Sequence, residues 1–336
     1  MSIPMVSVVM SVFNGERFLK KAVDSVLTQS LQDLQFIIVD DGSTDTTRDI
    51  VHGYSDPRVE YVYQENAGLT RGLNRGFALA AGEYVARMDA DDVSLSGRFD
   101  SQIAFLKCHP DVGLLGTQAY GIDAKGETLG YEALPVDADQ VEKELRRRGN
   151  CIVHGSVILR RSVFDAVGGY CDGFRFAQDY DLALRIADRY RVCNLPEFHY
   201  CLRIRLDSIT CRHYAEQTQF AALARALASK RSRGLPASLE DEKRGVFEGR
   251  GRGNEERRGE GIVSSLLCAY GTTNLNNDEP KLARVVLRKS LELNMYNTRA
   301  AALYLLSYFP RNVRKHCRRA YQLLRHGSIV TPELRS

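Results

Sequence analysis

The sequence lacks several features that would assign the protein to a specialised class. No uncharged run reaches the length of about 18 residues that a helix needs to cross a bilayer. Glu16 and Arg17 interrupt the first apolar stretch, so we expect no secretory signal. The net charge is only +4 over 336 residues, which gives no indication of a nucleic-acid partner. We therefore expect a protein that is soluble or binds a membrane peripherally.

The eight cysteines form no C-x-x-C pair and have no zinc-ligand spacing. Scattered thiols of this kind are typical of reduced cysteines, which favours a cytoplasmic location, including the inner face of the membrane. The apolar and charged fractions, 44% and 26%, are those of an ordinary globular protein. A chain of this length can form one large α/β domain with an appendage, or two domains.

Strand and helix patterns alternate through the first 90 residues. Apolar runs predict strands at 6–13, 36–39, 59–63 and 84–88. Between them, apolar residues at helical spacing predict helices at 16–28, from about 46, and at 70–81. This order predicts an α/β fold, a doubly wound and mostly parallel sheet flanked by helices.

Polar or aromatic side chains stand where each predicted strand ends. They are Phe13, then Asp40 and Asp41, then Asn66, and finally Asp89 and Asp91. In doubly wound sheets, ligands bind in the crevice beyond the carboxyl ends of the strands. We therefore expect these loops, which are unrelated in sequence, to meet in one cleft.

The segment GEYVARMDADD carries three carboxylates within four residues, Asp89, Asp91 and Asp92. Such a group repels itself at a strand end unless a cation lies among the carboxylates. Oxygen ligands favour Mg²⁺ or Mn²⁺, which keep positions open for substrate phosphates. The alternative is a solvated acidic turn.

The remainder of the chain continues the first domain and then changes character. A strand-like segment at 151–159 contains His154, and 179–190 has the pattern of a helix, so residues 1–212 are predicted to form one domain. Residues 213–260 predict a helix followed by a charged flexible linker. Residues 261–336 predict a C-terminal helical region without a repeat of fixed period.

The last predicted helix, 310–326, is basic. Its cationic residues are Arg311, Arg314, Lys315, Arg318, Arg319 and Arg325. A basic amphipathic helix can lie on an anionic membrane surface, which would make the protein peripheral there. Packing on a neighbouring helix with a solvated basic face is the other interpretation.

Four segments together resemble the family 2 glycosyltransferases, which have the GT-A fold. They read VSVVMSVFNGERFLKKAVDSVLTQS, IIVDDGSTDTT, ENAGLTRGLNRGFALAAGEYVARMDADD and FAQDYDLALR. The resemblance covers roughly residues 5–212 and implies an inverting, metal-dependent enzyme. It would move a sugar from a nucleotide sugar, foremost a UDP sugar, to a hydroxyl of a saccharide or lipid-linked acceptor. Cell-surface polysaccharide or glycolipid synthesis would be the setting, with no nucleic-acid partner.

On this resemblance, the donor nucleotide would lie at the ends of the first strands. Asp41, with Asp40 beside it, would meet the uracil imide, while Phe13 stacks on the base and Ser11 lies on the same strand. A carboxylate can accept the N3–H of uracil. The alternative for this D-D-G-S-T-D segment is an Asx turn that caps the next helix, a role we assign to Asp45.

The resemblance also implies contacts to the ribose, the diphosphate and the metal. Asn66 and Gly68 would lie under the ribose. Arg71 and Asn74 would contact phosphate or sugar, or else be ordinary surface residues of a helix. Asp91 would ligate Mn²⁺ or Mg²⁺, and Asp89 would hold the ribose or a metal-bound water.

Asp179 matches the catalytic base of the family, which takes the proton of the attacking hydroxyl. Gln178 stands where the family often has Glu, so a contact that needs a second charge is in doubt. His154 matches a histidine near the acceptor or diphosphate. The alternatives are a helix N-cap for Asp179 and a hydrogen-bonded structural role for His154.

Two other functions fit part of the pattern. Residues 89–93 also match the D-x-D-x-[TV] loop of haloacid-dehalogenase-like phosphatases, but the D-G-x-x-D element precedes that loop instead of following it. A nucleotide-sugar-binding module without turnover is the third hypothesis. The full set of Asp41, Asp89, Asp91 and Asp179 favours an enzyme.

Overall fold

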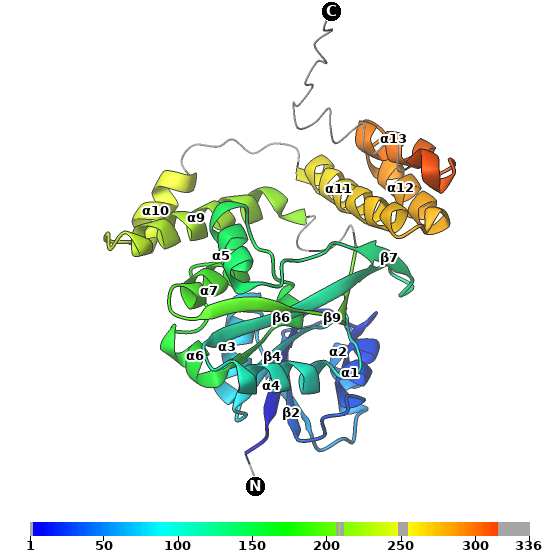
Figure 1. The fold of residues 1–336 in the computed structure, drawn as a ribbon. Helices are drawn as coiled ribbons and strands as arrows, with labels where there is room; N and C mark the ends of the chain where they lie inside the picture. Colours follow the sequence, from blue (N-terminus) through cyan, green and yellow to red (C-terminus); the bar gives the residue numbers. More distant parts are fainter. Residues whose placement is uncertain (1–2, 206–207, 209–211, 248–254, 315–336) are drawn as a thin grey trace, which may run out of the picture. The chain divides into compact units, whose positions relative to one another are not determined.

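The structure is a computed structural model that describes residues 3–205, 208, 212–247 and 255–314 (Figure 1). The chain divides into two compact units. The first comprises residues 1–128 and 133–258, and the second comprises 129–132 and 259–336. We describe each unit by itself.

Strands and helices alternate in the first unit in the predicted order. Its strands are β1 Val6–Val12, β2 Leu34–Asp41, β3 Val59–Gln64, β4 Tyr84–Asp89, β5 Val93–Ser94, β6 Val112–Ile122, β8 Ile158–Arg160 and β9 Arg191–Arg203. Its helices are α1 Leu19–Leu27, α2 Thr47–His52, α3 Leu69–Leu79, α4 Arg98–Cys108, α5 Ala138–Arg147, the 3₁₀ helix η1 His154–Ser156, α6 Arg161–Ala166, α7 Gln178–Ala187, α9 Tyr214–Ser232 and α10 Leu239–Phe247.

The strands form a mixed sheet in the order β3-β2-β1-β4-β8-β6-β9-β5. The first four are parallel, with Ser11 of β1 in register with Val39 of β2 and with Asp89 of β4. β8 runs antiparallel to both β4 and β6, whereas β9 is parallel to β6. The carboxyl ends of the four parallel strands therefore meet at one edge, as the predicted cleft requires.

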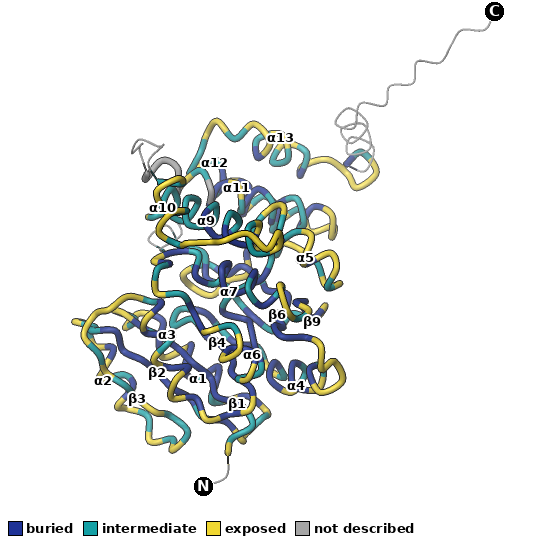
Figure 2. The backbone as a smooth tube through the Cα atoms, turned by 90° about the vertical axis from the view of Figure 1, so that its left-hand side faces the viewer, coloured by how far each residue is buried: buried dark blue, intermediate teal, exposed yellow. Residues whose placement is uncertain are grey.

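Alternate residues of β1 face opposite sides of the sheet and join separate cores. Val9 packs in the core with Leu73 of α3, while Val8 packs in the other core with Leu19 of α1 and Phe99 of α4. Figure 2 shows β1, β2 and β4 as largely buried chain. Burying each such side chain contributes about 1.5–3 kcal/mol, and this explains why continuous apolar runs predicted the strands.

Within 230–260, the range expected to form a charged linker, the structure contains α10 and the beginning of α11 (Glu255–Asn276). The Phe247 ring of α10 meets the Phe220 ring of α9 edge-on, with centroids 5.1 Å apart. Lys230 and Glu242 form an ion pair between the same two helices. The aromatic contact and the ion pair thus hold α10 against α9, although this part of the sequence is almost entirely polar.

The second unit packs α11, α12 (Pro280–Leu293) and α13 (Thr298–Leu306) around a small apolar core. Ala283, Leu287 and Ala300 are fully buried there. Strand β7, Thr128–Tyr131, leads into this unit, where Asn274 donates to the carbonyl of Leu129 at 3.0 Å. None of the helices in the described ranges is both long and apolar enough to cross a bilayer.

Much of the predicted basic helix, 310–326, lies outside the described residues, which end at Arg314. Arg314 is 5% exposed and pairs with Asp278, and Arg311 lies 3.6 Å from the same carboxylate. Two of the six cationic residues therefore contact the second unit itself. The membrane interpretation of this segment stays a prediction.

Candidate active site

The loops after β1 and β2 are fastened to one another at the carboxyl edge of the sheet. The side-chain oxygen of Asn14 accepts from the N–H of Thr44 at 2.8 Å, and the N–H of Asn14 donates to Ser43 Oγ at 2.9 Å. Asn14 has a φ of 52°, a left-handed conformation that asparagine tolerates better than most residues. Phe13, which precedes it, is 52% exposed and so can offer a ring face to a ligand.

Asp40 and Asp41 are both buried at the end of β2 but contact different loops. Asp40 accepts from the Ser43 N–H at 2.8 Å and from the Tyr61 hydroxyl at 2.7 Å, contacts that hold the turn. Asp41 accepts from the N–H groups of Ala67 and Gly68, each at 2.8 Å, and from Gln64. A carboxylate has about four lone-pair sites, so Asp41 keeps one for a further donor.

The segment after Asp41 contains Asp45, for which the sequence predicts a role in capping the next helix. Asp45 accepts from the N–H of Thr47, in the first turn of α2, at 3.0 Å. Its other oxygen accepts from the Glu16 N–H at 3.0 Å. The predicted capping role of Asp45 is confirmed, and Asp41 has no part in capping α2.

The residues predicted to line the ribose and phosphates differ in their surroundings. Asn66 is exposed, and Gly68 has a φ of 89° at the start of α3. Arg71 is exposed, with Asp172 at 3.7 Å. Asn74 binds the 170–172 segment, because it donates to the Tyr170 carbonyl at 2.9 Å and accepts from the Tyr170 N–H at 3.0 Å. Ser11 is half-buried beneath α3, where a side chain at Gly72 would lie 2.3 Å from its hydroxyl.

Three carboxylates cluster where β4 ends. Burial and the charge of Asp89 raise the pKa of Asp91, and the same two causes, with Asp91 added, raise the pKa of Asp92 well above its usual value. Asp89 is paired with the buried Arg87. Arg205 lies 3.6 Å from Asp91, and the N–H of Arg203 donates to Asp92 at 2.7 Å.

The described residues contain no group of three or more His, Cys, Asp or Glu side chains arranged to hold a metal by themselves. Mg²⁺ and Mn²⁺ sites in phosphate-transferring enzymes need only one or two carboxylates, because substrate phosphates complete the shell. Burial and the charge of Asp89 raise the pKa of Asp91, so a cation beside Asp91 would stabilise its charged form. The residues present therefore fit a divalent ion that arrives with a diphosphate.

Asp179 lies in the first turn of α7, after Ala177, which has a left-handed φ of 54° at the N-cap position. Asp179 is therefore not the N-cap. Its carboxylate accepts from the side-chain amide of Asn150 at 2.7 Å. Burial raises the pKa of Asp179, while nearby backbone N–H groups, the charge of Arg87 and the Asn150 amide act against this increase. A raised pKa brings a carboxylate closer to the range of a general base.

His154 and Tyr170 line the same small cavity as Asp179. His154 Nε2 is 2.8 Å from the Tyr170 hydroxyl, so the structural alternative for this histidine describes a contact that is present. Burial and the charge of Arg87 hold the pKa of His154 well below its usual value, which keeps the ring neutral. Burial and the charges of Asp179 and Asp89 raise the pKa of Tyr170. Both carboxylates thus lie within electrostatic range of one phenol.

A cavity of about 10 Å³ adjoins these groups, lined among others by Asn150, His154, Tyr170 and Asp179. A space of this size is about the minimum that one water molecule needs. Gln178, the other residue predicted on the acceptor side, is 5% exposed. Hydrogen bonds thus join the loops after β1, β2 and β3 at the carboxyl edge of the sheet, and besides burial, Asp179 and Asp89 both raise the pKa of Tyr170.

Several residues of this site could not be recognised from the sequence. Arg87 gave one signal, since it is a charged residue inside an otherwise apolar strand, YVARMD. Asn150, Tyr170 and Tyr200 gave none, because each belongs to a segment that long-range folding brings to the site. Tyr200 is fully buried, and its hydroxyl accepts from the N–H of Asp89 at 3.2 Å.

The parallel strands, with an acidic segment at the end of β4 and a carboxylate at the start of α7, have the arrangement of the GT-A fold, and solved structures agree on this fold. Staphylococcus aureus TarS 1–349 in complex with UDP aligns with a TM-score of 0.53 at 16% identity, covering 94% of this chain and 91% of that one. The Pyrobaculum calidifontis mannosyltransferase PcManGT, in complex with GDP-Man and Mn²⁺, gives 0.52 at 17% identity, covering 92% and 89%.

Sequence comparison identifies the family. The profile described as "Glycosyl transferase family 2" matches residues 7–168. Bacillus subtilis EpsE, a "putative glycosyltransferase", is 32% identical over 227 residues, which cover 66% of this chain and 80% of EpsE. Escherichia coli WbnJ, an "O-antigen biosynthesis glycosyltransferase", is 30% identical over 66% of this chain and 84% of WbnJ. The chain belongs to glycosyl transferase family 2, so it is a glycosyltransferase and the phosphatase hypothesis is wrong.

Proposed function

We propose that this glycosyltransferase is inverting and metal-dependent, and that it moves a sugar from a UDP sugar to a hydroxyl acceptor. The observation that carries the proposal concerns Tyr170. Besides burial, Asp179 from α7 and Asp89 from β4 both raise the pKa of its hydroxyl, so both carboxylates act on this one group. A transfer reaction needs one group of carboxylates at the diphosphate and a separate carboxylate at the acceptor.

The donor nucleotide is assigned to the loops after β1, β2 and β3. Asp41 has a lone pair left to accept the N3–H of uracil, and the exposed Phe13 ring can stack on the base. Asn66 and Gly68 adjoin Asp41 and would contact the ribose. Binding of UDP by the TarS structure and of GDP-Man by PcManGT supports a nucleoside-diphosphate sugar, with uracil favoured by the carboxylate of Asp41.

Asp91, with Asp89, would hold the divalent ion, which would neutralise the charge that develops on the departing diphosphate. Arg205 adds a positive charge on the same side, 3.6 Å from Asp91. Because Asp89 is paired with Arg87, we assign it to the ribose or to a water of the ion, and Asp91 to the direct contact.

At the acceptor, Asp179 takes the proton of the attacking hydroxyl. The new bond joins that oxygen to the anomeric carbon while the bond from this carbon to the diphosphate breaks, so one displacement inverts the configuration. Asn150 orients the carboxylate, and neutral His154 with Tyr170 forms the wall beside it. The O-antigen role stated for WbnJ supports a saccharide or lipid-linked acceptor in polysaccharide synthesis.

The test is release of nucleoside diphosphate from a panel of UDP and GDP sugars, with Mn²⁺ or Mg²⁺ and a set of saccharide acceptors. We expect release from a UDP sugar, loss of release on chelation, and recovery with Mn²⁺. Turnover that continues unchanged in excess chelator would contradict the metal assignment. Release from GDP sugars alone would contradict the assignment of Asp41 to uracil.

A further inference from the structure

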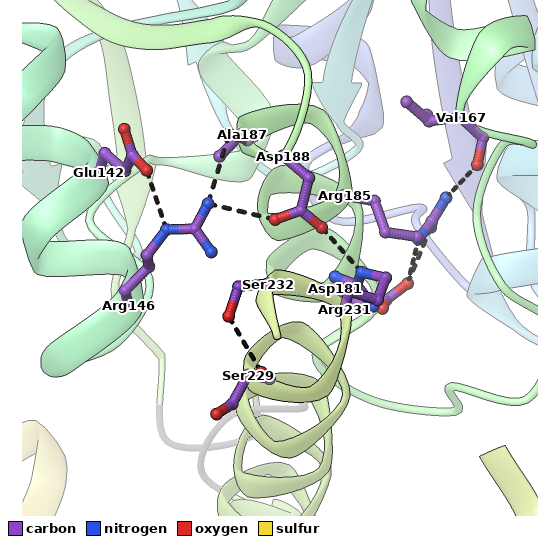
Figure 3. Close-up of polar contacts among 10 residues, drawn as sticks. All are labelled: Glu142, Arg146, Val167, Asp181, Arg185, Ala187, Asp188, Ser229, Arg231 and Ser232. Atoms are coloured by element: carbon purple, nitrogen blue, oxygen red, sulfur yellow. Dashed lines mark hydrogen bonds and ion pairs between the residues drawn. The ribbon is translucent and has the colours of Figure 1, made fainter. Parts of the chain in front are cut away.

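A second cavity lies in the first unit, where α6 and α7 end and where α5 and the last turn of α9 border it (Figure 3). Its volume is about 370 Å³. That value falls within the range of about 300–1,000 Å³ found for small-molecule sites. Four arginines line it, Arg146, Arg185, Arg189 and Arg231. The cavity is therefore large enough for a ligand, and arginines make up four of its eight lining residues.

Two of these arginines share one carboxylate. Arg146 Nη2 lies 3.1 Å from one oxygen of Asp188, and Arg231 Nε lies 2.7 Å from the other. Asp188 thus holds both guanidinium groups at the rim, one from α5 and one from α9. Glu142 lies 2.9 Å from Arg146, so Asp188 and Glu142 together balance the charges of these two arginines.

The other two arginines cap the preceding helix. Arg185 donates to the Val167 carbonyl at 2.6 Å and pairs with Asp181, while Arg189 donates to the Ala166 carbonyl at 2.8 Å. These contacts hold both side chains at the end of α6. The contact of Arg189 uses one N–H of its guanidinium, which has five.

Arg231 has one buried donor without an acceptor in the described part of the chain, although its side chain as a whole is 28% exposed. Its Nε contacts Asp188, but Nη2 is buried and has no hydrogen-bond partner among the residues that the structure describes. A buried donor without an acceptor is costly, and an acceptor supplied by a ligand would remove that cost. Charge-assisted hydrogen bonds from a guanidinium to phosphate oxygens are among the strong hydrogen bonds that proteins make.

We propose that this cavity is a second binding site, for a small ligand that carries a phosphate or diphosphate group. The site is distinct from the carboxylate cluster, because Asp179 lies in the first turn of α7 and Asp188 follows its last. A helix of ten residues separates its ends by about 15 Å. The proposal does not require turnover, so it stands or falls independently of the transferase assignment.

The test is calorimetry of the full chain with inorganic pyrophosphate, in a chelating buffer at low salt. Arg231→Gln and Arg189→Gln should each weaken binding about tenfold, since each removes a charge-assisted contact. Arg189→Gln leaves the ion pairs of Asp188 intact, so it is informative even if Arg231→Gln fails to fold. Arg233→Gln is the matched control, because Arg233 is exposed, lies on the C-cap of α9 and lines no part of the cavity.

A parallel measurement distinguishes a free phosphate from a lipid headgroup. The same variants are tested for sedimentation with vesicles of phosphatidylcholine alone and with added phosphatidylglycerol. The site is supported if the cavity variants lose binding of pyrophosphate or of the anionic vesicles while Arg233→Gln keeps it. Which of the two probes binds shows whether the ligand is a free phosphate or a lipid headgroup. Absence of both kinds of binding, or equal loss in all three variants, would overturn the proposal.

Discussion

The surroundings of Asp179 shift its pKa in opposite directions, and the resulting pKa sets the pH range in which the carboxylate can act as a base. Burial raises its pKa, whereas Arg87 and the Asn150 amide favour the ionised form. A base must be ionised, so activity falls as the pH drops through this raised pKa. The acid limb of kcat/KM should therefore lie above the usual carboxylate range.

Asn150→Ala provides a direct check of this balance. The substitution removes a donor that stabilises the carboxylate, so the pKa of Asp179 rises further and the acid limb moves to higher pH. The measurement is kcat/KM against pH for both proteins. A limb that stays in place or moves to lower pH would show that Asn150 does not act on the base.

The acidic cluster of β4 leads to a prediction about metal affinity. Metal ligands must be deprotonated, and the pKa values of Asp91 and Asp92 are raised. Affinity for Mn²⁺ in the presence of UDP should thus decrease at a higher pH than it would for carboxylates with ordinary pKa values. Calorimetry should also show a loss of about tenfold or more in Asp91→Asn, by analogy with the 10–100-fold that outer-shell changes alone cost. An unchanged affinity in Asp91→Asn, matching the exposed control Asp111→Asn, would contradict the assignment.

At the scale of single elements, α3 is tied to the loop that carries Tyr170. Asn74 donates to the Tyr170 carbonyl and to Asp172, and accepts from the Tyr170 N–H. Asn74→Ala should lower the free energy of unfolding by about 1–3 kcal/mol, because partners are left without hydrogen bonds. Denaturant unfolding measures this.

Arg71→Ala on the same helix is the control for Asn74. Its side chain is 65% exposed and its ion pair with Asp172 spans 3.7 Å, so it should cost less than about 1 kcal/mol. Equal losses in the two variants would show that Asn74 is no more than a surface residue of α3.

Elements with a strong local pattern could be predicted from the sequence. β1 and β4 are mostly apolar runs, and α3 repeats its buried residues at helical spacing, so the predicted and observed positions of these elements agree to within about two residues. β8 could not be found as the strand between β4 and β6. It has three residues, and its antiparallel pairing depends on partners more than forty positions away.

The residues of the site show the same difference between local sequence patterns, which can be predicted, and long-range contacts, which cannot. The carboxylates that end β2 and β4 could be recognised because neighbouring parallel strands end at one edge. The electrostatic interactions that relate Asp179 to Asp89, by way of Tyr170 and Arg87, could not be recognised. They join three separate segments that only tertiary packing brings together. Asn74 shows the converse, because its position on α3 suggested a ligand contact while its amide binds the chain itself.

At the scale of the whole molecule, the family profile covers residues 7–168, and the proposed base lies just beyond that range. The second unit has its own small core and an ordered contact between Asn274 and Leu129. The predicted division into a transferase domain at 1–212, a connecting segment at 213–260 and a helical region at 261–336 remains a proposal.

We propose that the carboxylates of β4 act at the donor diphosphate while Asp179 acts at the acceptor hydroxyl, and Asp179→Asn separates these two roles. In the full chain, with Mn²⁺ and the preferred UDP sugar, kcat should fall by about 10²–10⁴-fold while the affinity for UDP changes little. Asp165→Asn, the same change at a carboxylate that is 65% exposed on α6, should leave both values unaltered. Transfer by Asp179→Asn at the unmodified rate would contradict the account.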